Sequence, residues 1–121
     1  MPQMEERYGR LLGGLARRRA ELRDLIAERR AALERHSTGA GAVEDSVDTA
    51  FRRSSAEVES EMIEHYLREV ARIEAAEARA AAGIFGICAG CMLPIDESRL
   101  QANPTSLRCL ACQERYEKNS Y

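Results

Sequence analysis

The chain has 121 residues, of which 45% are apolar and only 5% aromatic, so it can form at most one modest domain with an appended module. Its 18 basic and 20 acidic side chains give a formal net charge of −2, which does not indicate a protein that binds nucleic acid through a basic surface. No stretch reaches about 18 consecutive apolar residues and no signal-peptide core follows the N-terminus, so we expect a cytoplasmic protein that does not enter a membrane.

The first predicted element is a long helix over residues 3–35, which are dense in Arg, Glu, Leu and Ala. One set of positions follows an alternating three- and four-residue spacing, typical of a coiled-coil seam with two polar interruptions. These seam positions are Leu12, Leu15, Arg19, Leu22, Ile26, Arg29 and Leu33. Gly13 and Gly14 each lower helix propensity by about 1 kcal/mol relative to Ala, so we expect the first turns to fray or bend.

A second long helix follows a small, glycine-bearing turn at residues 36–42. Its start is either near Asp48 or at a capping box formed by Ser54 and Glu57. Its expected apolar stripe consists of Val58, Met62, Ile63, Tyr66, Val70, Ile73, Ala76 and Ala80. Two long helices joined by a short connection predict an antiparallel coiled-coil hairpin over residues 1–82.

The connection carries an acidic segment, residues 44–50, which would lie at the tip of the hairpin. Physical chemistry leaves two interpretations of its aspartates open. Asp45 and Asp48 could cap the second helix and complement its dipole, or they could contact a partner.

Residues 83–121 form the second predicted domain, a module that begins where Gly83 and Gly86 end the helix. Its cysteines stand as two CxxC pairs separated by seventeen residues, the spacing of a tetrathiolate zinc site: Cys88, Cys91, Cys109 and Cys112. Free thiols, two disulfides or a redox dithiol are the alternatives. A module of 39 residues is too small for a sufficient core, which favours one structural Zn²⁺.

Within this module, Pro94 and Pro104 predict an irregular loop between the two cysteine pairs. A short terminal helix is expected over residues 110–118, with the second pair at its start. The predicted fold class is therefore mainly α, a long antiparallel coiled-coil hairpin followed by a small C4 zinc-finger module with a short C-terminal helix.

Several segments resemble the DksA/TraR family. Gly83-Ile-Phe-Gly-Ile-Cys88-Ala-Gly-Cys91, Pro94-Ile95, Arg99-Leu100-Gln-Ala102-Asn-Pro104 and Cys109-Leu-Ala-Cys112 resemble its C4 zinc finger. Counting back from Cys88, the segment Asp45-Ser-Val-Asp48-Thr-Ala50 falls where DksA-type members carry the coiled-coil-tip motif DxxDxA. Hairpin, tip and finger together extend the resemblance to nearly the whole chain.

The resemblance implies a monomeric, non-enzymatic bacterial transcription regulator of the stringent-response type that binds RNA polymerase without contacting DNA. Its hairpin would enter the secondary channel and place Asp45, Asp48 and Ala50 near the catalytic centre, which would modulate the stability of open promoter complexes. The zinc end would rest on the channel rim, where Arg99 is either a rim contact or a structural residue.

The chain departs from the family pattern at several positions. Met92 stands where family fingers commonly have Gly, which predicts a strained knuckle turn. The alarmone ppGpp is bound by DksA together with polymerase through basic residues around the finger. Arg72 preserves one of these, but Asn103 and Gln113 replace two others, so the resemblance makes ppGpp a possible but doubtful ligand.

Three other functions fit parts of the sequence. Paired tip aspartates could hold Mg²⁺ and stimulate transcript cleavage, as Gre-type factors do. A zinc-stapled helical adaptor for another protein would share every structural prediction. A nucleic-acid-binding zinc ribbon would rely on the basic cluster Arg17-Arg-Arg19, but Glu21 and Asp24 follow it on the same helix, which favours a solvated face.

Overall fold

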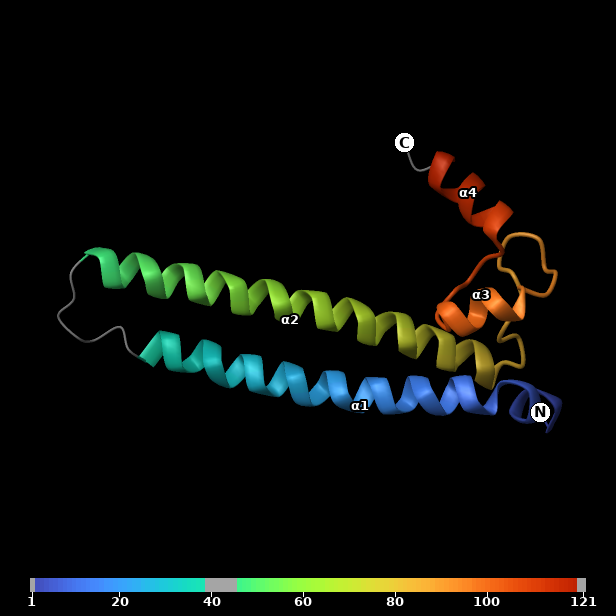
Figure 1. Cartoon of the computed structure of the whole chain (residues 1–121), viewed down its shortest axis with the longest axis horizontal. Coiled ribbons are helices and arrows are strands. Elements are labelled where there is room, and N and C mark those ends of the chain that lie inside the picture. Colours follow the sequence, from blue (N-terminus) through green and yellow to red (C-terminus); the bar gives the residue numbers. More distant parts are fainter. Residues whose placement is uncertain (1, 39–45, 120–121) are drawn as a thin grey trace. The chain divides into compact units, whose positions relative to one another are not determined.

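The computed structural model describes residues 2–38 and 46–119 and shows a mainly helical chain, as the sequence predicted. The described residues contain four helices: α1 (Pro2–Thr38), α2 (Ser46–Ala81), α3 (Glu97–Ala102) and α4 (Leu110–Asn119) (Figure 1). None of these helices combines the length and the apolar character that crossing a membrane requires.

Helices α1 and α2 pair in antiparallel fashion (Figure 1). Arg18 Nε lies 2.6 Å from a carboxylate oxygen of Glu69, and Arg29 Nη1 lies 3.4 Å from one of Glu59. From Arg18 to Arg29 the residue number on α1 rises, while that of the paired glutamate on α2 falls from 69 to 59, so the two helices run antiparallel. The predicted helical hairpin is confirmed.

The seam predicted for α1 is confirmed, since every one of its positions is buried or half-buried. Leu22 has no exposed surface and Ile26 is only 6% exposed. The expected fraying at Gly13 and Gly14 is wrong, because α1 runs from Pro2 to Thr38 without a break. Packing along the seam offsets the low helix propensity of two glycines.

The stripe predicted for α2 is correct except at its first position. Val58 is exposed, whereas the neighbouring Glu59 turns toward α1 and pairs with Arg29. An arginine on the seam needs a carboxylate opposite it, since an unpaired half-buried charge is costly. Helix α2 begins at Ser46, so Ser54 lies within the helix and does not cap it.

Contacts within the chain define two compact units. One unit consists of Arg18–Ala71, the middle part of the helix pair. The other consists of Met1–Arg17 together with Arg72–Tyr121, so the first turns of α1 belong with the cysteine-bearing module. The predicted division into folding domains at residue 83 stays a prediction.

The core of the second unit explains why the start of α1 belongs to it. Tyr8 of α1 packs edge-to-face on Phe85, with ring centroids 5.0 Å apart, and both side chains are buried. Ile95 and Leu100 complete this core and are almost fully buried. At its surface, Arg7 Nε lies 2.8 Å from a carboxylate oxygen of Glu97.

Helix α3 corrects the prediction of an irregular loop between Pro94 and Pro104. Six residues, Glu97–Ala102, form a helix that buries Leu100 completely. It ends at Asn103, whose N–H donates to the carbonyl of Arg99. The prolines flank the helix instead of interrupting it, and burial of one leucine stabilises a turn too short to be stable alone. Helix α4 agrees with the expected terminal helix.

Candidate metal centre and partner-contact residues

The first cysteine pair lies on a tight turn held by backbone hydrogen bonds. Cys88 N–H donates to the carbonyl of Leu93 at 2.8 Å, and Met92 N–H donates to the carbonyl of Cys88 at 3.0 Å. Before and after the turn, Ile87 and Pro94 form an antiparallel bridge. This arrangement brings Cys88 and Cys91 to the same side of the turn.

Met92 closes this turn in the left-handed region, with φ of 64°. It is the one non-glycine residue with positive φ among the residues that the structure describes. A side chain in this region costs about 1–2 kcal/mol relative to glycine, which confirms the strain expected from the substitution at this position.

The second pair is placed by the start of α4. Cys109 precedes the helix and Cys112 lies in its first turn, where Gln113 N–H donates to the carbonyl of Cys109 at 2.9 Å. A further hydrogen bond, from Ala89 N–H to the carbonyl of Leu107 at 2.8 Å, joins the segments that carry the two pairs. These backbone hydrogen bonds hold the segments that carry the two pairs next to each other.

Gly90 allows the two pairs to approach each other closely. A Cβ atom at this position would lie 3.0 Å from both Cβ and Sγ of Cys112. The sequence Cys-Ala-Gly-Cys therefore needs glycine at this position, because a larger residue would clash with Cys112.

The four sulfur atoms lie within 4.8 Å of one another, and those of Cys91 and Cys109 are 4.0 Å apart. A tetrahedral Zn²⁺ with Zn–S bonds of about 2.3 Å separates its sulfurs by about 3.8 Å, so the cluster fits one zinc ion with little adjustment. No disulfide joins these cysteines, all four of which are free. The predicted structural zinc site is therefore supported by geometry as well as by spacing.

Electrostatics around the sulfurs also favour a metal. Burial raises the pKa of Cys88, but the N–H groups of Cys109, Cys91 and Gly90 stabilise its thiolate and lower the pKa to about 6. The pKa of Cys112 rises to about 12, first because of its hydrogen bond with Cys109 and then that with Cys88. Four crowded thiols cannot all ionise without a compensating cation, which Zn²⁺ supplies.

The predicted tip residues lie around the start of α2. Asp45 falls outside the described residues. Asp48 belongs to α2, but its side chain is not described. Ala50 is exposed on the same helix. Their role as partner contacts stays a prediction.

The predicted contact residues Arg72 and Arg99 have different environments. Arg72 is exposed on α2. Arg99 is half-buried on α3, and its Nε donates to the carbonyl of Arg108 at 3.0 Å. Arg99 therefore supports the segment that leads to Cys109, and its role as a partner contact stays a prediction.

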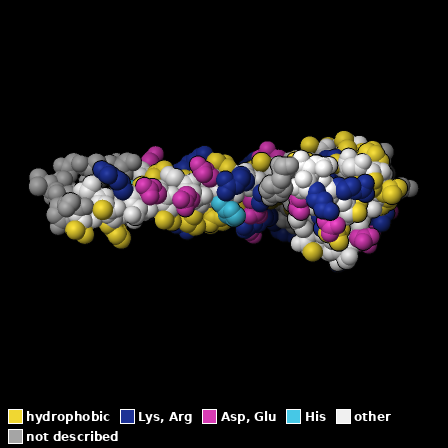
Figure 2. Space-filling model, turned by 90° about the horizontal axis from the view of Figure 1, so that it is seen from above, with side chains coloured by type: hydrophobic (Ala, Val, Ile, Leu, Met, Phe, Trp, Pro, Cys, Tyr) yellow, Lys and Arg dark blue, Asp and Glu magenta, His cyan; other side chains and the backbone are white. Residues whose placement is uncertain are grey.

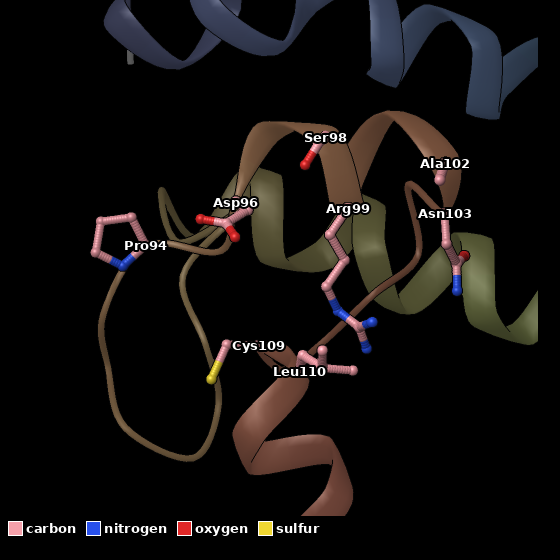
Figure 3. A pocket seen from close by; sticks show the side chains of 8 residues that line it. All are labelled: Pro94, Asp96, Ser98, Arg99, Ala102, Asn103, Cys109 and Leu110. Atoms are coloured by element: carbon pink, nitrogen blue, oxygen red, sulfur yellow. The ribbon is translucent and has the colours of Figure 1, made fainter.

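Arg99 also faces a cavity of about 420 Å³ beside the second cysteine pair (Figure 3). The lining residues are Pro94, Asp96, Ser98, Arg99, Ala102, Asn103, Cys109 and Leu110. Figure 3 shows the guanidinium of Arg99 extending from α3 toward Leu110, on the side where Asn103 lies. Asp96 adds a carboxylate to the same lining, so the cavity does not present the concentrated positive charge that a polyanion requires.

The two neutral residues that replace expected cations are both engaged within the chain. The side-chain carbonyl of Asn103 accepts a hydrogen bond from the Thr105 hydroxyl at 3.0 Å. The side-chain amide of Gln113 donates to a carboxylate oxygen of Glu117 at 3.1 Å. Whether ppGpp binds stays a prediction.

Sequence reasoning missed the role of Tyr8 and Gly86. Gly86 has φ of 80°, and a Cβ there would lie 2.8 Å from the Tyr8 hydroxyl oxygen and 3.3 Å from a methyl carbon of Leu100. The seam spacing indicates that Tyr8, four residues before Leu12, is buried, but it does not identify Phe85 as its partner. Tyr8 therefore belongs to the core that contains Phe85.

Comparisons with known proteins agree with this geometry. Residues 83–118 match the family described as "Prokaryotic dksA/traR C4-type zinc finger". No curated protein sequence matches the chain.

Among solved structures, the chain is similar to transcription factor DksA2 from Pseudomonas aeruginosa, with 26% sequence identity and a TM-score of 0.82. The similarity covers 96% of this chain and 87% of that one. The family resemblance inferred from the sequence is therefore confirmed: the chain carries the C4-type zinc finger of the DksA/TraR family at residues 83–118.

Proposed function

We propose that the protein is a non-catalytic bacterial transcription regulator that binds RNA polymerase directly. The observation that carries the proposal is the combination of a DksA/TraR finger with a similarity to a DksA2 transcription factor over 96% of the chain. The motif DxxDxA at residues 45–50 supports it, since residues 46–50 form the start of α2 at the end nearest the connection from α1.

In this proposal the helix pair enters the secondary channel of the polymerase, and Asp45, Asp48 and Ala50 act near the catalytic centre. Carboxylates held there would bind the alternative conformations of mobile catalytic elements unequally. A partner that binds two conformations with different affinity redistributes them by that difference, and the lifetime of open promoter complexes would change accordingly. The protein would act as a cytoplasmic monomer.

The cysteine-bearing unit would serve as the docking end. When bound, Zn²⁺ would link the two cysteine pairs and so stabilise the finger. Residues of the chain would make the contacts with the polymerase. Arg99 braces the segment before Cys109 through the Arg108 carbonyl, while Arg72 and the remaining guanidinium N–H groups of Arg99 are the proposed rim contacts.

Binding to purified bacterial RNA polymerase core enzyme tests the proposal. We would compare the wild type with Cys109→Ser and with Asp45→Asn/Asp48→Asn. The matched control is Glu61→Gln/Glu64→Gln, which removes two exposed carboxylates from α2 outside the motif. We expect tight binding that requires the finger, and a tip variant that still binds but no longer alters open-complex lifetime. The control should behave as the wild type.

Two results would contradict the proposal. Absence of binding by folded, zinc-loaded protein to several bacterial polymerases would indicate an adaptor for another protein. Shortened transcripts in stalled complexes incubated with the protein and Mg²⁺ would indicate a Gre-like cleavage factor instead.

The same assay addresses ppGpp. Because Asn103 and Gln113 carry no charge, we expect ppGpp to change the effect of the wild type on open complexes only weakly. Asn103→Arg/Gln113→Lys should increase that response. A strong response of the wild type would show that other residues bind the alarmone.

A further inference from the structure

Helix α2 exposes three large apolar side chains near its N-terminal end. Val47 is 74% exposed, Phe51 72% and Val58 53%. At about 100° per residue, these positions fall within an arc of roughly 40° on one face of the helix, and the uncharged Ser54 lies about 20° from the edge of that arc. We call Val47, Phe51 and Val58 the apolar face of α2. Figure 2 shows hydrophobic side chains at the surface of this end of the helices.

The pairing of α1 with α2 leaves this face uncovered. Glu59, which pairs with Arg29 of α1, lies roughly 80° around the helix from Phe51. The fractional exposures agree, since Ile63 and Val70, roughly 100–120° around the helix from Phe51, are half-buried and buried. Hydrophobic contacts among the described residues of α1 and α2 therefore do not account for Phe51 or Val47.

The size of the face argues against a second copy of the chain as its occupant. Three side chains of this kind expose a few hundred Å², whereas a stable dimer buries about 800 Å² on each partner. A face this small suits one part of a larger interface that also contains other contacts.

Its position identifies that larger interface. Val47 lies inside the tip motif of residues 45–50, and Phe51 directly follows Ala50. A protein surface that contacts the tip aspartates therefore comes within one residue of Val47 and within three residues of Phe51. We propose that the apolar face of α2 packs against an apolar surface of RNA polymerase beside the site of the tip aspartates. This inference rests on the function proposed above.

The two kinds of contact would have different roles. Carboxylates orient the tip and their attraction weakens with salt, while burial of an aromatic side chain contributes affinity that salt hardly screens. The loss of affinity on truncating Phe51 should therefore be the same at low and high salt. Any loss of affinity on neutralising Asp45 and Asp48 should be modest and should become smaller as salt rises.

Competition binding to polymerase core enzyme tests the inference, with Phe51→Ser as the variant. The matched control is Leu67→Ser, because Leu67 is 43% exposed on the same helix but lies roughly 160° around it from Phe51. We expect Phe51→Ser to bind about tenfold more weakly and Leu67→Ser to bind within twofold of the wild type. Val47→Ser/Val58→Ser should weaken binding as well. Circular dichroism and zinc content should match among all variants.

Three other outcomes would contradict the apolar contact, the proposed function or the choice of the polymerase as the occupant. If the wild type binds and Phe51→Ser binds equally well, the apolar contact is wrong and the proposed function stands. If the wild type does not bind at all, the proposed function fails and the inference fails with it. If sedimentation shows a dimer that Phe51→Ser abolishes, the occupant is a second copy and not the polymerase.

Discussion

Replacing Gly86 with Ala would place a methyl group in the tightest part of the finger core. The backbone at this position has φ of 80°, where a side chain costs about 1–2 kcal/mol. The new Cβ would also lie 2.8 Å from the Tyr8 hydroxyl oxygen and 3.0 Å from the ring carbon that bears it. Overpacking of this kind costs about 1–3 kcal/mol, so we expect Gly86→Ala to lower the free energy of unfolding by about 2–5 kcal/mol.

Urea unfolding followed by circular dichroism, with Zn²⁺ in constant excess, measures this loss. Gly9→Ala is the matched control, because Gly9 is helical and a Cβ there meets nothing within 4 Å. That variant should gain up to about 1 kcal/mol from helix propensity. Gly86→Ala should therefore lower the free energy of unfolding, whereas Gly9→Ala should raise it.

A double-mutant cycle separates the two contributions to this loss of stability, the steric clash with Tyr8 and the strain of a side chain at positive φ. Tyr8→Phe removes the hydroxyl that lies closest to the new methyl, so the double variant should recover about 1 kcal/mol relative to the sum of the single losses. An unchanged unfolding midpoint for Gly86→Ala, with an unchanged denaturant slope, would refute the close packing of Tyr8 against Gly86.

Three further predictions concern the metal, the first knuckle and α1. Chelation of the metal, or Cys109→Ser, should unfold the finger, since binding of structural zinc contributes about 10–16 kcal/mol to folding. Metal analysis should find one zinc ion per chain. The cysteines should react with a thiol reagent only after chelation. Met92→Gly should raise the free energy of unfolding by about 1 kcal/mol by relieving positive φ, and a loss in urea unfolding would argue that the Met92 side chain stabilises the turn. Gly13→Ala and Gly14→Ala should each stabilise α1 by about 1 kcal/mol, because their Cβ atoms would meet only the guanidinium of Arg17, and thermal unfolding should show both gains.

The helix pair and the metal site could be predicted because their signals are local and periodic. Leu22 and Ile26 repeat with the helix, and two CxxC pairs define a tetrathiolate cluster from spacing alone. Val58 was assigned to the wrong face because its neighbour Glu59 is acidic. Only a partner across the pair, Arg29, explains why the carboxylate turns inward.

The finger core could not be predicted in the same way, because its contacts join distant parts of the chain. Nothing near Tyr8 in the sequence indicates that it packs on Phe85, 77 residues later. The same holds for α3, whose six residues carry little periodicity and depend on burial of Leu100 in that core. The tip motif was found by resemblance alone, since two aspartates beside a helix start also fit a simple cap.

The contact of Tyr8 with Phe85 has a consequence for the order of events during protein synthesis. The middle of the helix pair can form as soon as residue 71 leaves the ribosome, because the parts of α1 and α2 that contact each other there both lie within Arg18–Ala71. The first turns of α1 must wait for the finger, whose last cysteine is Cys112. At about 5–20 residues per second, Tyr8 is synthesised roughly 5–20 seconds before Cys112. During that interval the core that finally buries the Tyr8 ring is incomplete, because the finger that contains Phe85 has not yet been fully synthesised.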